Sequence, residues 1–142
     1  EPLFLKRDCM RVSIFMSPMN VHVNRMPRAG LVKNVRYSEG RFHVASKEIA
    51  SQANEQNAIH VRCDDGGELM VVQIAGILAR RIVCDVRPGH RPQTADRIGL
   101  IRFGSRVDVY LPDEFEPCVS VGQKASAGRT VVATRRGPLI PT

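Results

Sequence analysis

Tryptophan is absent from this 142-residue sequence, and aromatic residues make up only 5% of it. So few aromatic side chains leave little surface on which bases can stack, which argues against a protein that binds single-stranded nucleic acid. The four cysteines include no CxxC pair and no Cys/His cluster, so we expect no structural metal site. Long apolar runs are also missing. The longest, Met70–Leu78, is broken by Gln73 and is far shorter than the roughly 18 residues of a membrane-spanning helix.

Basic residues are in clear excess. The 21 Lys and Arg residues against 14 Asp and Glu give a formal net charge of +7 and a pI near 9.8. This balance favours an anionic partner such as nucleic acid, acidic lipid headgroups or a phosphorylated ligand. Hydrophobic residues, at 43%, suffice for the core of one globular domain over residues 1–142. A chain with its own core does not need disulfide bonds, so we expect reduced thiols.

Short alternating segments separated by Gly and Pro turns predict a mainly β fold, either a barrel or a sandwich. One polar segment, Ser46–Asn57, is instead predicted to be a short helix or an ordered loop. A turn at Asp64–Gly67 predicts a β-hairpin. The predicted strands are Arg11–Met16, Val21–Asn24, Leu31–Tyr37, Ile59–Cys63, Leu69–Ile74, Ile82–Val86, Ile98–Arg102, Val107–Leu111, Val119–Val121 and Thr130–Ala133.

Two segments offset by 32 to 33 residues share one pattern. Val86–Gly89 followed by Ala95–Ile98 is repeated as Val119–Gly122 followed by Ala127–Thr130. Each copy reads as a strand, a glycine turn, a short bridge, a second turn and a strand. The pattern resembles the hammerhead hairpins of barrel-sandwich hybrids, the architecture of biotinyl and lipoyl carrier domains. Lys124 lies in a turn without the flanking hydrophobic residues of a modified carrier lysine, so a carrier function is not favoured.

A Gly-Ser bond, Gly104–Ser105, joins two predicted strands. Because glycine has no Cβ, the chain can bend there and the Ser105 hydroxyl can approach the preceding carbonyl. Attack of Ser105 Oγ on that carbonyl would move the acyl group from nitrogen to oxygen. Elimination of the ester would leave dehydroalanine, which hydrolyses to a pyruvoyl group and ammonia. A Gly-Ser pair in a turn is commonplace, so the bond alone does not predict self-cleavage.

Four segments around this bond resemble, in order and over nearly the whole chain, the short single-domain class of phosphatidylserine decarboxylases: Phe15–Pro27, Asn54–Asn57, Val71–Cys84 and Arg102–Pro112. The resemblance implies a proenzyme that cuts itself between residues 104 and 105 into a β chain of residues 1–104 and an α chain of residues 105–142. It implies a covalent pyruvoyl cofactor made from Ser105. It also implies phosphatidylserine as the substrate, with phosphatidylethanolamine and carbon dioxide as products.

The implied cofactor suits the chemistry. Loss of carbon dioxide from an amino acid leaves a carbanion that a bare side chain cannot delocalise, whereas a pyruvoyl carbonyl that has condensed with the substrate amine can. His22 alternates with Asn20 and Asn24 on one face of its strand. The resemblance makes it the active-site histidine near the substrate carboxylate, able to protonate the carbanion or assist elimination. Without the resemblance, a half-buried strand histidine with one hydrogen bond would be the simpler interpretation.

Four arginines are candidates for binding the headgroup: Arg80, Arg81, Arg102 and Arg106. A planar guanidinium group binds phosphate or carboxylate with paired hydrogen bonds. The alternative for each of them is ordinary solvated surface charge. Arg135 and its neighbour near the end of the sequence favour contact with an anionic membrane surface.

The chain differs from the larger members of the family at two positions. Arg25 stands where they carry a second histidine, and Asn20 replaces an aspartate often found two residues before the first. The family's Pro-x-Asp-Gly motif, whose aspartate assists processing, and its membrane anchor are expected to precede Glu1. Asp85 and Asp108 are the nearest substitutes by strand context, and the base for self-cleavage stays unassigned. We therefore expect association with the cytoplasmic side of a membrane through an anchor outside this chain.

Other functions remain open alongside a phosphatidylserine decarboxylase. The first is an uncleaved, non-enzymatic barrel-sandwich binding module, in which Ser105 stays a serine. The second is a related pyruvoyl enzyme that acts on a soluble amino acid. Nucleic-acid binding rests on net charge alone and is not expected. A homodimer is expected only from the resemblance.

Overall fold

The computed structural model describes residues 8–16, 21–39, 55–76, 82–102 and 105–136. Within these ranges all helical or extended regular structure is β-strand, which confirms the mainly β prediction. The strands are β1 (Met10–Phe15), β2 (Val21–Arg25), β3 (Gly30–Ser38), β4 (Gln56–Cys63), β5 (Glu68–Ile74), β6 (Ile82–Cys84), β7 (Arg97–Arg102), β8 (Arg106–Leu111), β9 (Phe115–Pro117) and β10 (Ala133–Arg135).

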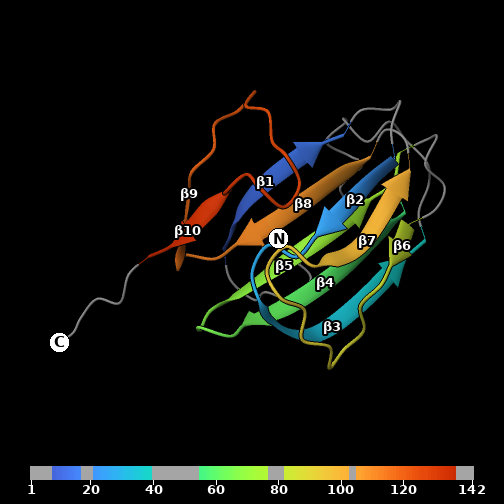
Figure 1. Cartoon of the computed structure of the whole chain (residues 1–142), viewed down its shortest axis with the longest axis horizontal. Helices are drawn as coiled ribbons and strands as arrows, with labels where there is room; N and C mark the ends of the chain where they lie inside the picture. Colours follow the sequence, from blue (N-terminus) through green and yellow to red (C-terminus); the bar gives the residue numbers. More distant parts are fainter. Residues whose placement is uncertain (1–7, 17–20, 40–54, 77–81, 103–104, 137–142) are drawn as a thin grey trace.

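The strands pair into three antiparallel sheets. Five strands form the largest sheet in the order β1-β8-β5-β4-β3, three form a second in the order β2-β7-β6, and β9 pairs with β10. The three-stranded sheet lies across one face of the five-stranded sheet, as Figure 1 shows. Among the described strands the pairings leave all three sheets open, so the arrangement is sandwich-like and no closed barrel is formed.

The five-stranded sheet is buried on both faces at its centre. In β5 every residue from Leu69 to Ile74 is buried, because β4 and β8 flank this strand and side chains cover both of its faces. Side chains on the inner face pack against the three-stranded sheet in the main core, which includes Ile59, Val61, Val71, Val109, Ile98 and Ile101. Side chains on the outer face form a second cluster of Ala58, Met70, Val72 and Ile74.

The predicted internal repeat is confirmed in the backbone. Gly89 and Gly122, 33 residues apart, have φ angles of +95° and +90°, and Ala95 and Gly128, also 33 apart, have φ angles of 72° and 74°. Both first turns close with a backbone hydrogen bond of about the same length, His90 N to Arg87 O at 3.0 Å in one and its equivalent at 3.1 Å in the other. The second turns of the two copies meet, since a Cβ on Gly128 would lie 3.9 Å from Ala95 Cβ.

Three predictions of local structure need correction. The predicted strand Thr130–Ala133 overlaps the observed β10 only at Ala133. Gln56 and Asn57, predicted to end a helix or ordered loop at 46–57, instead begin β4, because they pair with Ile74 and Gln73 of β5. Residues 46–54 of that segment lie outside the described residues. The predicted strand Val119–Val121 is also wrong. It lies in the turn region of the second repeat, and the neighbouring strand is formed earlier, at residues 115–117.

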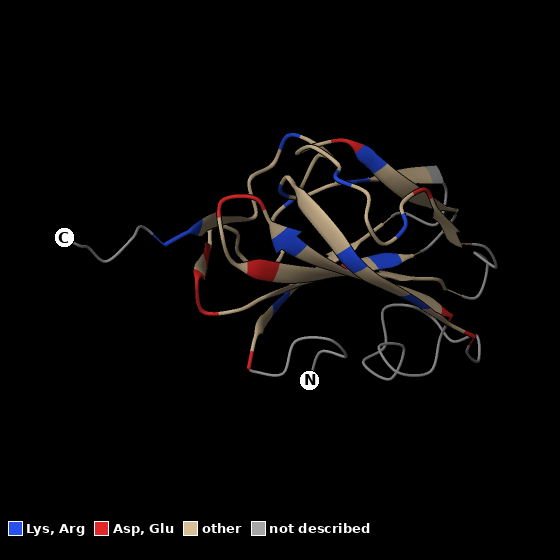
Figure 2. Ribbon diagram, turned by 90° about the horizontal axis from the view of Figure 1, so that it is seen from below, with Lys and Arg blue, Asp and Glu red and all other residues tan. Residues whose placement is uncertain are grey.

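Charged residues are distributed along the strands and their connections, as Figure 2 shows with Lys and Arg in blue and Asp and Glu in red. Several arginines are paired at the surface: Arg97 Nε lies 3.1 Å from Asp85 Oδ2, and Arg136 Nη1 lies 3.2 Å from Glu116 Oε1. Among the described residues, no His, Cys, Asp and Glu side chains form a group of three or more able to hold a metal ion. A search of the same residues finds no helix of the length and hydropathy needed to span a bilayer.

Candidate active site

Ser105 is buried, with an exposed fraction of 2%. It directly precedes β8 of the five-stranded sheet, which is called the main sheet below. Its carbonyl oxygen accepts a hydrogen bond from Met16 N at 3.0 Å, and its Oγ lies 3.9 Å from Met16 Sδ. The contact with Met16 Sδ, and alternation with the core residue Val107, place the Ser105 side chain on the inner face of the sheet, toward the three-stranded layer. Gly104, the other residue of the predicted cleavage bond, lies outside the described residues.

The pairing of neighbouring strands extends this position into a row. Ile74 of β5 pairs with Arg106 of β8 on one side and with Gln56 of β4 on the other. The neighbouring row of the sheet therefore consists of Ser105, Ala75 and Glu55. A hydrogen bond of 3.0 Å from Ala75 N to Glu55 O confirms the alignment. Side chains directly across antiparallel strands share a face, so these three residues line the same end of the inner surface.

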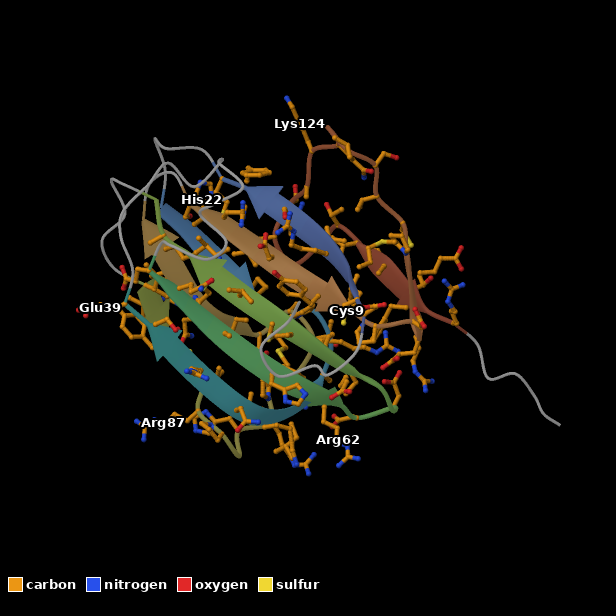
Figure 3. All side chains as sticks on the ribbon, turned by 180° about the vertical axis from the view of Figure 1, so that it is seen from behind. Cys9, His22, Glu39, Arg62, Arg87 and Lys124 are labelled. Atoms are coloured by element: carbon orange, nitrogen blue, oxygen red, sulfur yellow. The ribbon has the colours of Figure 1, made fainter. Side chains whose placement is uncertain are left out.

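His22 belongs to the other layer and faces the same interior. On β2 it pairs with Ile101 of β7, and it alternates with Asn24, whose side chain bonds to the main sheet. Residues two apart on a strand point to the same side, so the half-buried imidazole is directed between the two layers. Figure 3 shows His22 and Arg62 toward opposite ends of the molecule. Arg62 lies near the end of β4. The strand that pairs with His22 ends at Arg102, and only two residues separate it from Ser105.

A chain of buried amides joins the two layers beside this site. Gln73, fully buried in β5, donates from Nε2 to Asn24 Oδ1 at 2.8 Å and to Val83 O at 3.1 Å. Its Oε1 accepts from Asn57 Nδ2 at 3.0 Å. Gly99 makes room for this side chain, because a Cβ there would lie 2.5 Å from Gln73 Nε2 and 2.2 Å from Val83 O. The amides therefore fix the three-stranded sheet, and with it His22, against the main sheet.

A cavity of about 500 Å³ opens beside His22. Its walls come from β1, β2, β5, β8 and the loop over residues 125–133. Apolar side chains such as Met16, Val71 and Val109 line its interior, and three arginines, Arg25, Arg28 and Arg129, also contribute to its lining. Volumes of this size are typical of sites for small organic ligands. Phe15, Met16 and Met26 are also among its lining residues.

Arg106 lies on the opposite face of β8 from Ser105. The guanidinium group is 2% exposed and pairs with the fully buried Asp108, at 3.0 Å from Nε to Oδ1 and 3.2 Å from Nη2 to Oδ2. A headgroup contact by Arg106 would require this pair to separate, which is costly for buried charges. Asp108, one of the acids considered near the cleavage bond, is committed to the same pair. Asp85, the other, is exposed and bound to Arg97.

The other three arginines expected to bind the headgroup are described in part or not at all. Arg80 and Arg81 lie outside the described residues. The backbone of Arg102 pairs with Val21 at the end of β7, close to His22, and its side chain lies outside the description. The described residues place Ser105 and His22 on facing layers, and His22 lines the same cavity as Met16, the neighbour of Ser105 Oγ.

Sequence reasoning missed two groups of residues at this site. The amide chain had one signal, since Gln73 interrupts the longest apolar run and a polar residue there needs a buried partner. The arginines that line the cavity had none, because Arg28 and Arg129 are far apart in sequence and reach the same cavity only in the folded chain.

Comparison with known proteins gives one consistent family. The profile of the phosphatidylserine decarboxylase family matches residues 4–133. Phosphatidylserine decarboxylase proenzymes of Syntrophus aciditrophicus and Cereibacter sphaeroides are 50% and 54% identical over 130 and 123 residues, which is 92% and 87% of this chain. The aligned parts make up 61% and 53% of those proteins, so the chain spans little more than half the length of these relatives. No solved structure matches the chain.

Proposed function

The chain belongs to the phosphatidylserine decarboxylase family, and from this premise we propose that the protein decarboxylates phosphatidylserine to phosphatidylethanolamine after cutting itself between Gly104 and Ser105. One observation carries the proposal: the buried Ser105 and the imidazole of His22 face the same interior from two different sheets. A serine held out of water, with a histidine directed to the same space, is suited to acyl transfer.

Self-cleavage begins at Ser105. Its Oγ attacks the Gly104 carbonyl carbon, the bond from that carbon to the Ser105 nitrogen breaks, and the hydroxyl proton passes to the nitrogen. The resulting ester is eliminated when the Ser105 Cα loses a proton, which releases the Gly104 carboxylate and leaves a dehydroalanine. Water then converts this residue to a pyruvoyl group and releases ammonia. The products are a β chain of residues 1–104 and an α chain that begins at position 105 and includes residues 105–142.

The setting of Ser105 fits the pyruvoyl group. Conversion replaces the hydroxymethyl group by a methyl and the nitrogen by a ketone oxygen, so the product needs no more room than the serine. The apolar Met16 sulfur, 3.9 Å from Oγ, is a suitable neighbour for a methyl, and the retained carbonyl still accepts from Met16 N. The group supplies a carbonyl that condenses with the substrate amine and delocalises the electron pair left by carbon dioxide.

His22 is proposed to move protons at this site. Histidine side chains are the commonest general acids and bases in enzymes. From β2 it can accept the Ser105 hydroxyl proton during self-cleavage and return a proton to the substrate carbon after carbon dioxide leaves. The amide chain through Gln73 and Asn24 holds its strand in place for both steps.

The cavity is proposed to receive the rest of the lipid. Its apolar interior suits the glycerol and the first part of an acyl chain, while Arg25 and Arg129 in its lining suit the phosphate. Arg80, Arg81 and Arg102 remain proposed headgroup ligands. Contact with an anionic membrane surface on the cytoplasmic side is proposed from the net charge of +7. A homodimer is proposed from membership of the family.

The activity is tested by measuring carbon dioxide released from carboxyl-labelled phosphatidylserine in mixed micelles. We expect turnover by the wild-type protein and none by Ser105→Ala, with a strong loss in His22→Ala. A control with Ser120→Ala, an exposed turn serine, should match the wild type. Release from free serine without lipid would favour the enzyme of a soluble amino acid, and no release from either substrate would favour the non-enzymatic binding module.

A further inference from the structure

Glu55 is a buried carboxylate for which the proposed mechanism has no use. Its exposed fraction is 5%, and it lies immediately before β4. Oε2 accepts a hydrogen bond from the Tyr37 hydroxyl at 2.6 Å, whereas Oε1 has no hydrogen-bond partner among the described residues. Within the described part of the chain, Tyr37 is the one side chain that binds it. A buried carboxylate with a vacant oxygen is costly unless a positive or proton-donating group is bound at some stage.

The strand register directs this carboxylate to the end of the sheet where the cleavage bond lies. Glu55, Ala75 and Ser105 form one row across three adjacent strands, on the inner face. Two strand spacings separate the Glu55 and Ser105 backbones by roughly 10 Å. The residue between them, Ala75, is fully buried and has the smallest side chain that keeps a Cβ, so little bulk stands between the other two.

A positive charge forms at Ser105 during the reaction proposed above. When Oγ takes the Gly104 acyl group, the carbon–nitrogen bond breaks and the Ser105 nitrogen becomes a primary amine. That amine receives the hydroxyl proton and, on binding one more proton from water, becomes an ammonium ion. Resting on the proposed function, we propose that Glu55 is the electrostatic partner of this ammonium ion and draws the equilibrium from the amide toward the ester.

The expected effect follows from Coulomb's law. With the separation of the two backbones, roughly 10 Å, taken as the distance between the charges, and an effective dielectric constant of about 20, the equilibrium shifts by about tenfold. If Glu55 served only to accept the Tyr37 hydrogen bond, removing its charge while keeping its shape would leave the rate of self-cleavage unchanged. The two roles can therefore be separated by variants that keep either the charge or the shape.

The experiment follows self-cleavage by denaturing mass spectrometry of freshly translated protein. Glu55→Gln keeps the size of the side chain and its ability to accept from Tyr37, but removes the charge. Glu55→Asp keeps the charge and shortens the side chain. Glu39→Gln, an exposed residue just beyond β3, is the matched control. Hydroxylamine is added in parallel, because it attacks the ester carbonyl and traps the shifted form as a Gly104 hydroxamate.

We expect Glu55→Gln to cleave about tenfold more slowly than the wild type and to yield correspondingly less hydroxamate at early times. Glu55→Asp should cleave faster than Glu55→Gln, and Glu39→Gln should match the wild type. A rate for Glu55→Gln that equals the wild type, or exceeds that of Glu55→Asp, would overturn the proposal, since shape would then matter and charge would not.

Tyr37→Phe covers the case in which Glu55→Gln fails to fold. This variant removes the hydrogen bond and leaves the charge, so cleavage within about twofold of the wild type supports the electrostatic role, and a loss as large as that expected for Glu55→Gln contradicts it. Failure of the proposed function itself looks different. In that case the wild-type protein stays uncut and yields no hydroxamate.

Discussion

Gln73 donates a hydrogen bond of 2.8 Å to Asn24 across the two layers of the fold, so that the centre of the main sheet is tied to the strand that carries His22. Both side chains are buried, with exposed fractions of 0% and 6%. Apolar packing alone is non-directional, whereas these amides bond only in one register of the two sheets. The geometry of the site therefore depends on a polar contact that lies beside it.

Replacing Gln73 by Leu should destabilise the fold and slow self-cleavage together. The change leaves Asn24 Oδ1, Val83 O and Asn57 Nδ2 without this partner, at a cost of about 2–4 kcal/mol in the free energy of unfolding. Urea unfolding measures the first effect and mass spectrometry of the cut chains the second. Gln56→Leu, a partly exposed residue of β4, is the control and should change stability by less than about 0.5 kcal/mol. Equal effects of the two substitutions would mean that the amide chain does not hold the layers together.

The two repeats predict substitutions of opposite sign. Ala95 occupies a left-handed conformation, φ 72°, where its counterpart is Gly128 with φ 74°. A Cβ in this region costs roughly 1–2 kcal/mol, and the smaller entropy of the unfolded chain returns about half of that. Ala95→Gly should therefore raise the free energy of unfolding slightly, and Gly128→Ala should lower it by about 0.5–1 kcal/mol. Thermal unfolding measures both, and changes of the same sign would contradict this interpretation of the repeat.

The hydrogen bond from Tyr37 to Glu55 predicts a pH dependence. It raises the pKa of Tyr37 to about 12 from an ordinary value of 10.0. The folded protein thus keeps the phenol proton longer than the unfolded chain does, so the stabilisation is complete below pH 10 and is lost between pH 10 and 12.

This titration can be observed by the ultraviolet absorbance of the phenolate in a Tyr110→Phe background, where Tyr37 is the only tyrosine. We expect a midpoint near 12 that moves toward 10 in Glu55→Gln. A midpoint already near 10 with Glu55 present would show that the bond is not made in solution.

The buried pair of Arg106 and Asp108 should be sensitive to the loss of either partner. Asp108→Asn removes the charged partner of a 2% exposed guanidinium and should cost about 3–5 kcal/mol of stability, measured by urea unfolding. The double variant Arg106→Met with Asp108→Leu should lose less than the single one, because no buried charge is left. A single substitution that costs under about 1 kcal/mol would mean that the pair is solvated in solution.

Much of the fold could be predicted from local patterns. Alternation and turn residues located the long strands β4, β5 and β8, and the offset of 33 residues located turns that share their φ angles and hydrogen bonds. Polar residues misled where pairing outweighs propensity. Gln56 and Asn57 belong to a polar segment, yet they pair with β5 and begin a strand.

The site was only partly predictable for a similar reason. Ser105 and His22 were predicted from the resemblance of local motifs to the family, and their roles stay predictions. Arg106 has the sequence context of a ligand for an anion. Strand alternation places its side chain on the opposite face from Ser105, where it forms an ion pair with Asp108. The role proposed for Glu55 depends on register between three strands, which no single segment encodes.

Self-cleavage at Ser105 is tested most directly by the denaturing intact mass of the purified protein. The account predicts two species, one that ends at Gly104 and one that begins at position 105 and is lighter than a serine-started chain by the mass of ammonia. Ser105→Ala should stay a single uncut chain. A wild-type protein that also remains one uncut chain, 15.8 kDa for the sequence given, would contradict the account and leave the non-enzymatic binding module as the better explanation.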